Sequence, residues 1–364
     1  MTGQKMEKRI MVPLLVGFIL LLGAIAWLLF RDGSIDNSLS VSEETEDGEL
    51  KEELFAMDTV MEITLYRTGM TDKPLRDVFL EMRDRIYQLE GELSVTNSES
   101  EISRLNASSG TGEWMTVSDD VGYLVKETGY LAKYTEMDAA NHKYAFDPTL
   151  LPVVRLWGFT TGEFRVPSEA EIQKALEKTG IDKVESADEE KPKVRLNDGV
   201  QLDFGACAKG YLSDELSRIM KAHHVNGIMS LGGNVQTVGT KPDGSPFVVG
   251  ITDPADGSSM FATLESTDEA VITSGDYQRY FEDGGKRYHH IMDSRTGAPA
   301  DNDLASVTVI GKQGFTCDIY ATAFFVMGEE LTKQYIENKS FADKVILIRK
   351  DGSYWVSDGV NLIK

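Results

Sequence analysis

The sequence predicts an α+β fold, in which helices pack on a mixed or antiparallel sheet that follows one N-terminal transmembrane helix. Three observations predict it. Residues 11–30 form an apolar run of 20 residues without a charge, which is the length of a helix that spans a membrane. Helix and strand patterns follow this run, but they do not alternate regularly as they do in a doubly wound fold. Strand patterns dominate beyond Val194.

The charges around the apolar run predict its orientation. Three basic residues precede it, namely Lys5, Lys8 and Arg9. Only Arg31 follows closely, so the positive-inside rule places residues 1–10 in the cytoplasm and the rest of the chain outside, as a single-pass protein of the cell membrane. A cleaved signal peptide is the alternative, but this run is longer than a usual signal-peptide core and ends in bulky residues. No cysteine follows the run closely, which excludes lipoprotein processing.

An acidic segment separates the apolar run from the predicted domain at 54–364. Residues 33–53 contain eight acidic residues and one lysine, so residues 31–53 are predicted to form an extended, solvated tether. The whole chain has 37 Lys and Arg against 59 Asp and Glu, a formal net charge of −22. This balance disfavours a protein that binds nucleic acid or anionic lipid through a basic face. An anionic ligand would need a local site or a metal ion.

Hydrophobic periodicity predicts the elements of the domain in order. Helices are expected at 74–93, 119–137, 168–179, from about 208, and at about 316–327. Strands are expected at 60–66, 200–204, 227–231, 247–251, 261–265, 270–273, 306–310 and 345–348. The helix at 168–179 begins with a Ser-x-x-Glu capping box. The helix at 316–327 is apolar nearly all round and is therefore predicted to be buried.

The segment 200–211 carries the most informative polar pattern. A predicted strand ends in Asp203, a glycine turn follows, and Lys209 lies in the first turn of the next helix. Backbone N–H groups at a helix start and one ammonium group can hold a phosphate. Taken alone, however, the pattern is more often a plain strand-turn-helix with a surface lysine.

A second pattern places Asp318 and Thr322 four residues apart, on one face of the apolar helix at 316–327. An unpaired buried carboxylate is costly, so this one needs a partner. It is either an acid that caps the helix start, which is the common case, or a ligand of a hard metal ion with the threonine hydroxyl beside it.

Two further regions are rich in polar side chains, whereas familiar catalytic signatures are absent. Residues 230–234 more often form only a turn. Residues 273–280 and 288–297 combine aromatics, arginines, hydroxyls and a histidine pair, which exceeds the needs of a structural hairpin, although a histidine in such a run is usually just hydrogen-bonded. The sequence contains no zinc-peptidase, serine-hydrolase, penicillin-binding or P-loop motif, and its five histidines and two cysteines lack zinc-cluster spacing.

Taken together, these motifs resemble the FAD:protein FMN transferases, the ApbE family of flavin transferases. The matching segments are weak one by one, but they occur in the family's order over roughly residues 55–328. They are 56–59, 92–94, 100–106, 146–149, 157–159, 203–210, 230–234, 273–280, 290–297 and 318–328. The resemblance implies that residues 54–364 are a flavin transferase catalytic domain.

Members of this family cleave FAD at its pyrophosphate, release AMP and attach FMN to a threonine of an acceptor protein, with magnesium. The resemblance therefore implies an Mg²⁺-dependent enzyme with FAD as substrate. It also implies an acceptor in a membrane-associated electron-transfer complex. Two alternatives remain, an Mg²⁺-dependent FAD pyrophosphatase that yields FMN and AMP, and a non-catalytic FAD-binding carrier.

The resemblance also implies roles for individual residues. Asp318, Thr322 and the main-chain oxygen of Ala206 would coordinate magnesium. His290 matches the candidate base for the acceptor hydroxyl. The residues that would bind FAD are Met57, Asp147, Asp203, Lys209, Gly232, Gly233, Ser274, Gly275 and Ile291.

The sequence departs from the family's pattern at three positions. The family commonly has glycine where Asp58 stands, and apolar or small residues where Cys207 and Cys317 stand. Because these cysteines neighbour Ala206 and Asp318, we expect them to lie near one metal site, on segments that touch. A disulfide between them is possible outside the cytoplasm, and two small buried hydrophobic residues are the alternative.

Overall fold

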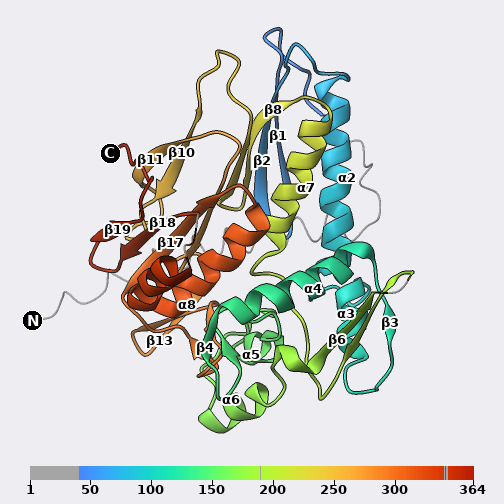
Figure 1. The fold of residues 1–364 in the computed structure, drawn as a ribbon, viewed down its shortest axis with the longest axis vertical. Coiled ribbons are helices and arrows are strands. Elements are labelled where there is room, and N and C mark those ends of the chain that lie inside the picture. Colours follow the sequence, from blue (N-terminus) through green and yellow to red (C-terminus); the bar gives the residue numbers. More distant parts are fainter. Residues whose placement is uncertain (1–40, 189, 340, 342) are drawn as a thin grey trace, which may run out of the picture. The chain divides into compact units, whose positions relative to one another are not determined.

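An eight-stranded sheet lies at the centre of the fold in this computed structural model of the protein (Figure 1). The strand order is β1 (Glu49–Ala56), β2 (Thr59–Tyr66), β8 (Asn226–Leu231), β9 (Asn234–Val238), β12 (Ala270–Gly275), β17 (Leu304–Gly311), β18 (Lys344–Arg349) and β19 (Tyr354–Val356). Every neighbouring pair in this sheet is antiparallel. The predicted α+β class is therefore confirmed, and the open choice between a mixed and an antiparallel sheet resolves to antiparallel.

The structure describes residues 41–188, 190–339, 341 and 343–364, and residues 43–364 form the unit discussed here. The predicted cytoplasmic N-terminus at 1–10 and the predicted membrane helix at 11–30 lie outside the described residues. Among the residues that are described, no helix has the length and apolar character needed to cross a membrane.

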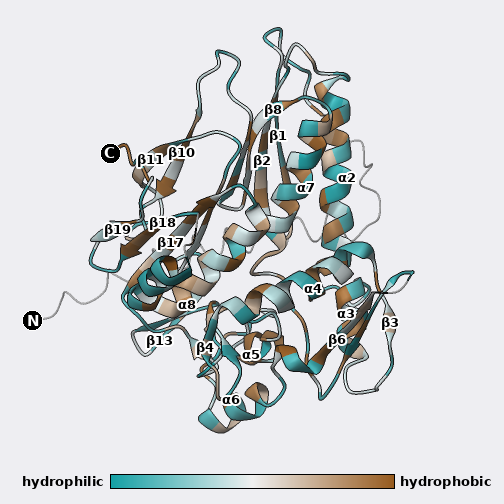
Figure 2. Cartoon of the chain, viewed as in Figure 1, coloured by the Kyte–Doolittle hydropathy of each residue, from teal (hydrophilic) through white to brown (hydrophobic). Residues whose placement is uncertain are grey.

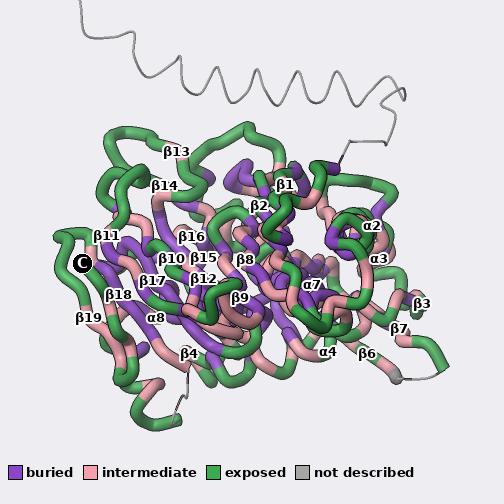
Figure 3. The backbone as a smooth tube through the Cα atoms, turned by 90° about the horizontal axis from the view of Figure 1, so that it is seen from above, coloured by how far each residue is buried: buried purple, intermediate pink, exposed green. Residues whose placement is uncertain are grey.

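Three helices pack on the central sheet, and a hairpin also packs against it. The helices are α2 (Leu75–Leu93), α7 (Ala208–Ala222) and α8 (Gly314–Lys339), and the hairpin is β10 (Phe247–Thr252) with β11 (Met260–Ser266). Val249 and Leu264 of the hairpin form one core with Val271, Ile310 and Ile346 of the sheet. Since side chains alternate along a strand, the residues between these sheet positions face the opposite side, where the helices lie. Every residue of β17 is therefore buried (Figure 3).

Smaller elements form the rest of the unit. The helices are α3 (Glu101–Ala107), α4 (Asp119–Tyr134), α5 (Leu151–Leu156), α6 (Glu169–Leu176) and the 3₁₀ turn η1 (Ile181–Lys183). A three-stranded sheet contains β3 (Met115–Thr116), β7 (Pro192–Leu196) and β6 (Val184–Asp188). Three short hairpins are β4 (Glu136–Asp138) with β5 (Lys143–Tyr144), β13 (Tyr280–Asp283) with β14 (Lys286–His289), and β15 (Met292–Asp293) with β16 (Ala298–Pro299). Hydrophobic residues concentrate in the strands of the central sheet, whereas exposed turns are hydrophilic (Figure 2).

Most predicted elements are present, and the helix boundaries follow from local interactions. The predicted capping box at Ser168 is confirmed, because Ser168 and Glu171 bond to each other's backbone N–H groups at the start of α6. The predicted helix at 316–327 is the buried first half of α8. This helix continues to Lys339 across Gly328, whose φ of +74° introduces a kink.

The predicted strand at 200–204 is wrong. These residues form only a single bridge, between Gln201 and Leu150. The Asn106 side chain bonds to both the N–H and the C=O of Leu202, at 2.7 and 2.8 Å, and so replaces a neighbouring strand. Because the N–H and the C=O of Leu202 both have a partner in this side chain, they do not need the hydrogen bonds of a neighbouring strand.

The tether predicted at 31–53 ends earlier than expected, because β1 already begins at Glu49. Leu50 and Leu54 are buried, whereas Lys51 and Glu53 between them are exposed. This alternation suits a strand at the edge of a sheet, whose charged side chains oppose pairing with other chains. Lys51 and Glu53, which the tether prediction included, therefore lie on the solvent face of an edge strand.

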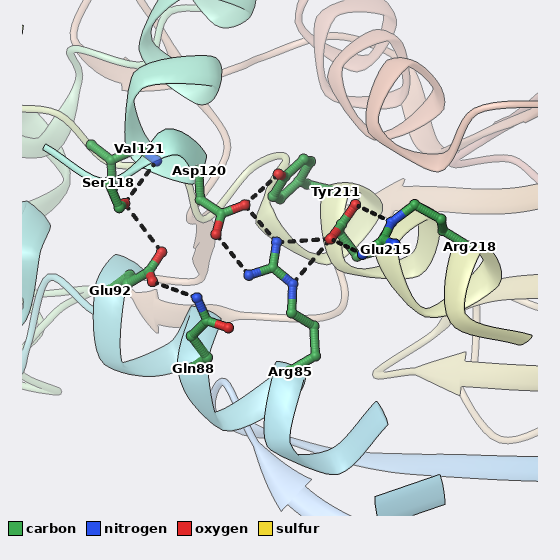
Figure 4. A network of polar contacts seen from close by, with 9 residues as sticks. All are labelled: Arg85, Gln88, Glu92, Ser118, Asp120, Val121, Tyr211, Glu215 and Arg218. Carbon is green, nitrogen blue, oxygen red and sulfur yellow. Dashed lines mark hydrogen bonds and ion pairs between the residues drawn. The ribbon is translucent and has the colours of Figure 1, made fainter. Parts of the chain in front are cut away.

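A polar network joins α2, α4 and α7 (Figure 4). Arg85 of α2 donates to both oxygens of Asp120 on α4, at 2.7 and 2.5 Å, and to Glu215 of α7, at 2.8 and 3.0 Å. The Tyr211 hydroxyl donates to the same Asp120, at 2.5 Å. The bonds to Asp120 raise the pKa of Arg85, so this guanidinium stays charged. One arginine thereby links three helices that are distant in sequence.

We expect Arg85→Ala to lower the free energy of unfolding by about 3 kcal/mol, because it leaves the largely buried Asp120 without a cation and Glu215 with only the exposed Arg218. Urea unfolding of the purified protein measures this. Arg218→Ala is the matched control, since Arg218 bonds to the same Glu215 but its side chain is 67% exposed. This variant should lose less than about 1 kcal/mol of the free energy of unfolding. Equal losses in the two variants would contradict a central role for Arg85.

Candidate active site

A cavity of about 460 Å³ lies where hairpin turns of the central sheet meet the starts of α7 and α8. Eleven of the thirteen site residues expected from the sequence line it: Met57, Asp147, Asp203, Ala206, Lys209, Gly232, Ser274, His290, Ile291, Asp318 and Thr322. Gly233 and Gly275 do not line it. At Gly275 a Cβ atom would come within 2.5 Å of the Tyr277 ring, so this glycine permits close packing behind the cavity wall.

Asp318 bonds to the start of a neighbouring helix and not to the start of its own. Its Oδ2 accepts a hydrogen bond from the Gly210 N–H in the first turn of α7, at 2.8 Å. The first N–H groups of α8, at Gly314 and Phe315, instead donate to Asp214, at 2.7 and 2.9 Å. Asp214 is therefore the capping acid of α8, and the common alternative for Asp318 is excluded.

Burial raises the pKa of Asp318 to about 6, although Lys209, the Gly210 N–H and the Asn234 amide act in the opposite direction. A further cation that reaches this carboxylate would stabilise its charged form. Thr322 lies one helical turn further along α8, and its hydroxyl is 3.3 Å from the Ser274 hydroxyl. Asp318, Thr322 and Ala206 all line the same cavity.

These groups provide one carboxylate and neutral oxygens, which is a donor set that suits magnesium. Mg²⁺ usually takes one or two protein carboxylates and fills its other positions with water and substrate phosphate oxygens. No group of three or more His, Cys, Asp or Glu side chains with metal-binding geometry occurs within the described ranges. The residues therefore fit a hard cation that is shared with a substrate, and they do not fit a zinc cluster.

Two cations line the cavity without a carboxylate partner. Lys209 lies in the first turn of α7, and Arg279 donates to the Phe159 carbonyl at 2.8 Å. Neither side chain forms an ion pair with any carboxylate in the part of the chain that the structure describes. In a chain with a net charge of −22, two unpaired cations beside a helix N-terminus make a local site for an anion.

Two further carboxyl groups line the same cavity, those of the buried Asp147 and the half-buried Asp203. Asp147 accepts hydrogen bonds at Oδ1 from the N–H and the hydroxyl of Thr149, whereas its buried Oδ2 has no partner among the described residues. Asp203 accepts from the Gly205 N–H at 2.8 Å. Burial raises the pKa of both. The free Oδ2 of Asp147 is an orphaned polar atom that a ligand's donor group would satisfy.

The two adjacent histidines have different environments. His290 lines the cavity, and its Nδ1 lies 3.1 Å from the Arg279 carbonyl. A carbonyl can only accept, so Nδ1 carries the proton and Nε2 keeps a free lone pair. Burial lowers the pKa of His290 to about 3, with Arg279 adding to the effect, so the ring is neutral at pH 7.

His289 faces away from this site. Its Nε2 donates to the Ala300 carbonyl at 2.9 Å, its Nδ1 accepts from the Ile291 N–H at 3.3 Å, and its ring packs edge-on against Phe325. Burial lowers the pKa of His289 to about 4. Both ring nitrogens are thus used in holding the segment that carries His290.

Comparison with known proteins identifies the family, because the sequence model of the ApbE family matches residues 57–346. The chain belongs to the ApbE family. A Klebsiella pneumoniae relative named FAD:protein FMN transferase is 36% identical over 256 residues, which is 68% of this chain and 76% of the relative. A Vibrio cholerae relative of the same name is 33% identical over 277 residues, which is 74% of this chain and 79% of that relative.

Solved structures of ApbE proteins have the same fold. The ApbE protein of Thermotoga maritima superposes with a TM-score of 0.77 at 31% identity, covering 85% of this chain and 97% of its own. The flavinyl transferase ApbE of Pseudomonas stutzeri superposes with a TM-score of 0.74 at 28% identity, covering 89% of this chain and 97% of its own. The fold expected from the ApbE resemblance is therefore the observed one.

Several residues of the ApbE cavity were not predicted individually. Thr273, Gln278 and Arg279 lie in the polar segment 273–280, and Asn234 ends the turn 230–234, so the motifs contained a signal for them. Phe159 likewise belongs to the matching segment 157–159. Glu90 lies in a helix, where its residue type alone is unremarkable, so only the folded chain brings it to the cavity.

The two cysteines at positions where this ApbE sequence departs from the family pattern are free buried thiols. Their segments touch as predicted, because the Gly210 N–H contacts Asp318 and a Cβ at Gly210 would collide with the Gly314 carbonyl. Burial raises the pKa of both thiols, which keeps them protonated. They fill buried space in the manner of small hydrophobic residues, and no disulfide joins them.

Proposed function

We propose that this chain is an FAD:protein FMN transferase that requires magnesium and attaches FMN to a threonine hydroxyl of an acceptor protein. The observation that supports it is the composition of one cavity. Oxygen donors for a hard cation, unpaired cations for phosphate and a neutral histidine with a free nitrogen all line it. These are the three requirements of a phosphoryl transfer, which depends on positioning and charge neutralisation.

In the proposed reaction, the threonine oxygen attacks the phosphorus on the FMN side of the FAD pyrophosphate. A new P–O bond forms to threonine, the bond to the bridging oxygen breaks, and AMP leaves with that oxygen. His290 accepts the hydroxyl proton at Nε2, while Lys209 and the N–H groups at the start of α7 hold the phosphate charge. Magnesium held by Asp318, Thr322 and the Ala206 carbonyl would supply further charge neutralisation.

The direct test incubates the detergent-solubilised full chain with FAD, MgCl₂ and membrane extract, and measures in-gel flavin fluorescence and AMP. A fluorescent protein band together with AMP supports the transferase. AMP without a band would identify the chain as an FAD pyrophosphatase instead. FAD binding with neither product would identify a carrier.

Asp318→Asn should lower AMP formation by at least about 10²-fold, because it removes the carboxylate charge of the metal site. The asparagine oxygen can still accept from the Gly210 N–H, so the variant should fold normally. The Thr322→Ala variant should need more magnesium than the wild type for AMP formation, but it should lose less activity than Asp318→Asn. Thr316→Ala is its matched control, since Thr316 lies on the same helix outside the cavity and should behave as wild type. Wild-type turnover by Asp318→Asn at low magnesium would exclude the proposed metal ligand.

His290→Asn should slow flavin transfer by about 10² to 10⁴-fold, which is the usual contribution of a general base. Its amide can still donate to the Arg279 carbonyl, so FAD binding should persist. His142→Asn is the control, because His142 is exposed and has a φ of +50° that asparagine tolerates. Loss of FAD binding by His290→Asn would show that this histidine has a structural role.

The proposal extends to location, with the domain outside the cytoplasm and held by the apolar run at 11–30. The acceptor would then belong to a membrane electron-transfer complex on that side. Protease added to intact spheroplasts should degrade the C-terminal part of the chain, whereas a cytoplasmic marker survives. Protection of this part in sealed cells, with degradation after lysis, would contradict the orientation.

A further inference from the structure

Two neighbouring hairpin turns of the central sheet meet at the cavity. Met57–Asp58 joins β1 to β2, and Gly232–Gly233 joins β8 to β9, while β2 and β8 are paired. The turns touch, since a Cβ atom at Gly232 would collide with the Thr59 side chain. The φ angles of the four turn residues are all positive, at 49°, 59°, 65° and 96°.

Positive φ at both central residues is the geometry of a type I′ turn, which glycine and asparagine adopt most readily. The Gly232–Gly233 turn meets this preference. The Met57–Asp58 turn does not, because each of its two residues has a Cβ atom, which makes positive φ more costly than it is for glycine. The first turn therefore depends on contacts that hold it in this conformation.

Glu90 in the last turn of α2 supplies such a contact. Its Oε1 accepts a hydrogen bond from the Met57 N–H at 2.9 Å. Ala56 and Thr59 face each other across the hairpin, so the Met57 N–H lies in the turn itself, outside the pairs of the strand ladder. A carboxylate acceptor gives this N–H a stronger partner than a neutral group would.

We propose that Glu90 is a positioning residue, which holds the Met57–Asp58 turn in the conformation that shapes one wall of the FAD site. Met57, Asp58, Thr59 and Glu90 all line the cavity. Because Glu90 and Asp58 are acidic, this wall repels phosphate and faces an uncharged part of the nucleotide, whereas Lys209 and Arg279 receive the phosphates. The inference rests on the proposed function, since it assumes that FAD is the ligand.

The first test compares FAD affinity among three variants of the detergent-solubilised full chain, by titration with FAD and flavin fluorescence. Glu90→Ala should bind FAD about ten-fold more weakly, since a hydrogen bond to a charged group is lost. Glu90→Gln should regain most of this affinity, because its amide oxygen can accept from the same N–H. Asp84→Ala is the matched control, as it removes an exposed carboxylate from the same helix outside the cavity.

Kinetics separate positioning from catalysis. For Glu90→Ala, the KM for FAD should rise by about the same factor as the dissociation constant, while AMP formation at saturating FAD changes less than about two-fold. A merely structural role would lower the folded fraction and leave the KM of the folded enzyme unchanged.

The second test removes the need for the contact. Glycine adopts positive φ without steric cost, so Asp58→Gly should relax the turn. In the Asp58→Gly background, Glu90→Ala should then lose clearly less FAD affinity than it does alone, and this double-mutant cycle reports the coupling. If Glu90→Ala alone folds poorly, Glu90→Gln should still bind FAD nearly as well as the wild type, and a loss of about ten-fold in that variant would overturn the inference.

The outcomes separate this inference from the proposed function. If the wild-type chain does not bind FAD, the proposed function fails and the inference fails with it. If the wild type binds FAD but Glu90→Ala binds equally well, only the inference is overturned. Equal losses from Glu90→Gln and Glu90→Ala, or additive effects in the cycle, would overturn it as well.

Discussion

The close contact between the first turn of α7 and the start of α8 determines where the groups of the site lie. Gly210 and Gly314 have no side chains to keep these helices apart, and a Cβ atom at either position would collide with the other helix. The Gly210 N–H can therefore reach Asp318 at 2.8 Å. The same approach brings Ala206 and Lys209, which precede and open α7, beside Asp318 and Thr322 on α8. Without this contact the chain would have separate oxygen donors and no common site.

The acidic chain accommodates an anion because its charges are unevenly paired. Away from the cavity, several cations have carboxylate partners, as in the cluster of Arg85, Asp120 and Glu215 that ties three helices together. Inside the cavity, Lys209 and Arg279 have none among the described residues. Desolvation raises the pKa of the nearby carboxyl groups of Asp147, Asp203 and Asp318. Net charge therefore says little about what this site attracts.

The histidine pair shows how neighbouring residues of one type acquire different roles. His289 uses both ring nitrogens in hydrogen bonds, and His290 uses one and keeps the other. The difference follows from the alternation of side chains along an extended segment, which directs one ring into the protein and the other to the cavity. The sequence contained the pair, but the environment of each ring depends on residues such as Arg279 and Ala300, which belong to other strands and turns.

The sequence by itself determined the elements whose patterns are local, and it carried the ordered motifs of the family. Periodic apolar residues predicted the long helices and most strands, and Ser168 with Glu171 predicted the start of α6. The segment at 200–204 was mistaken for a strand because its partner is the side chain of Asn106, about a hundred residues away. Tertiary structure alone decided that Asp214 caps α8 while Asp318 faces the site, and that Glu90 reaches the Met57 turn. The reason is physical: periodicity reports which face of an element is buried, whereas hydrogen bonds between distant segments depend on how whole elements pack.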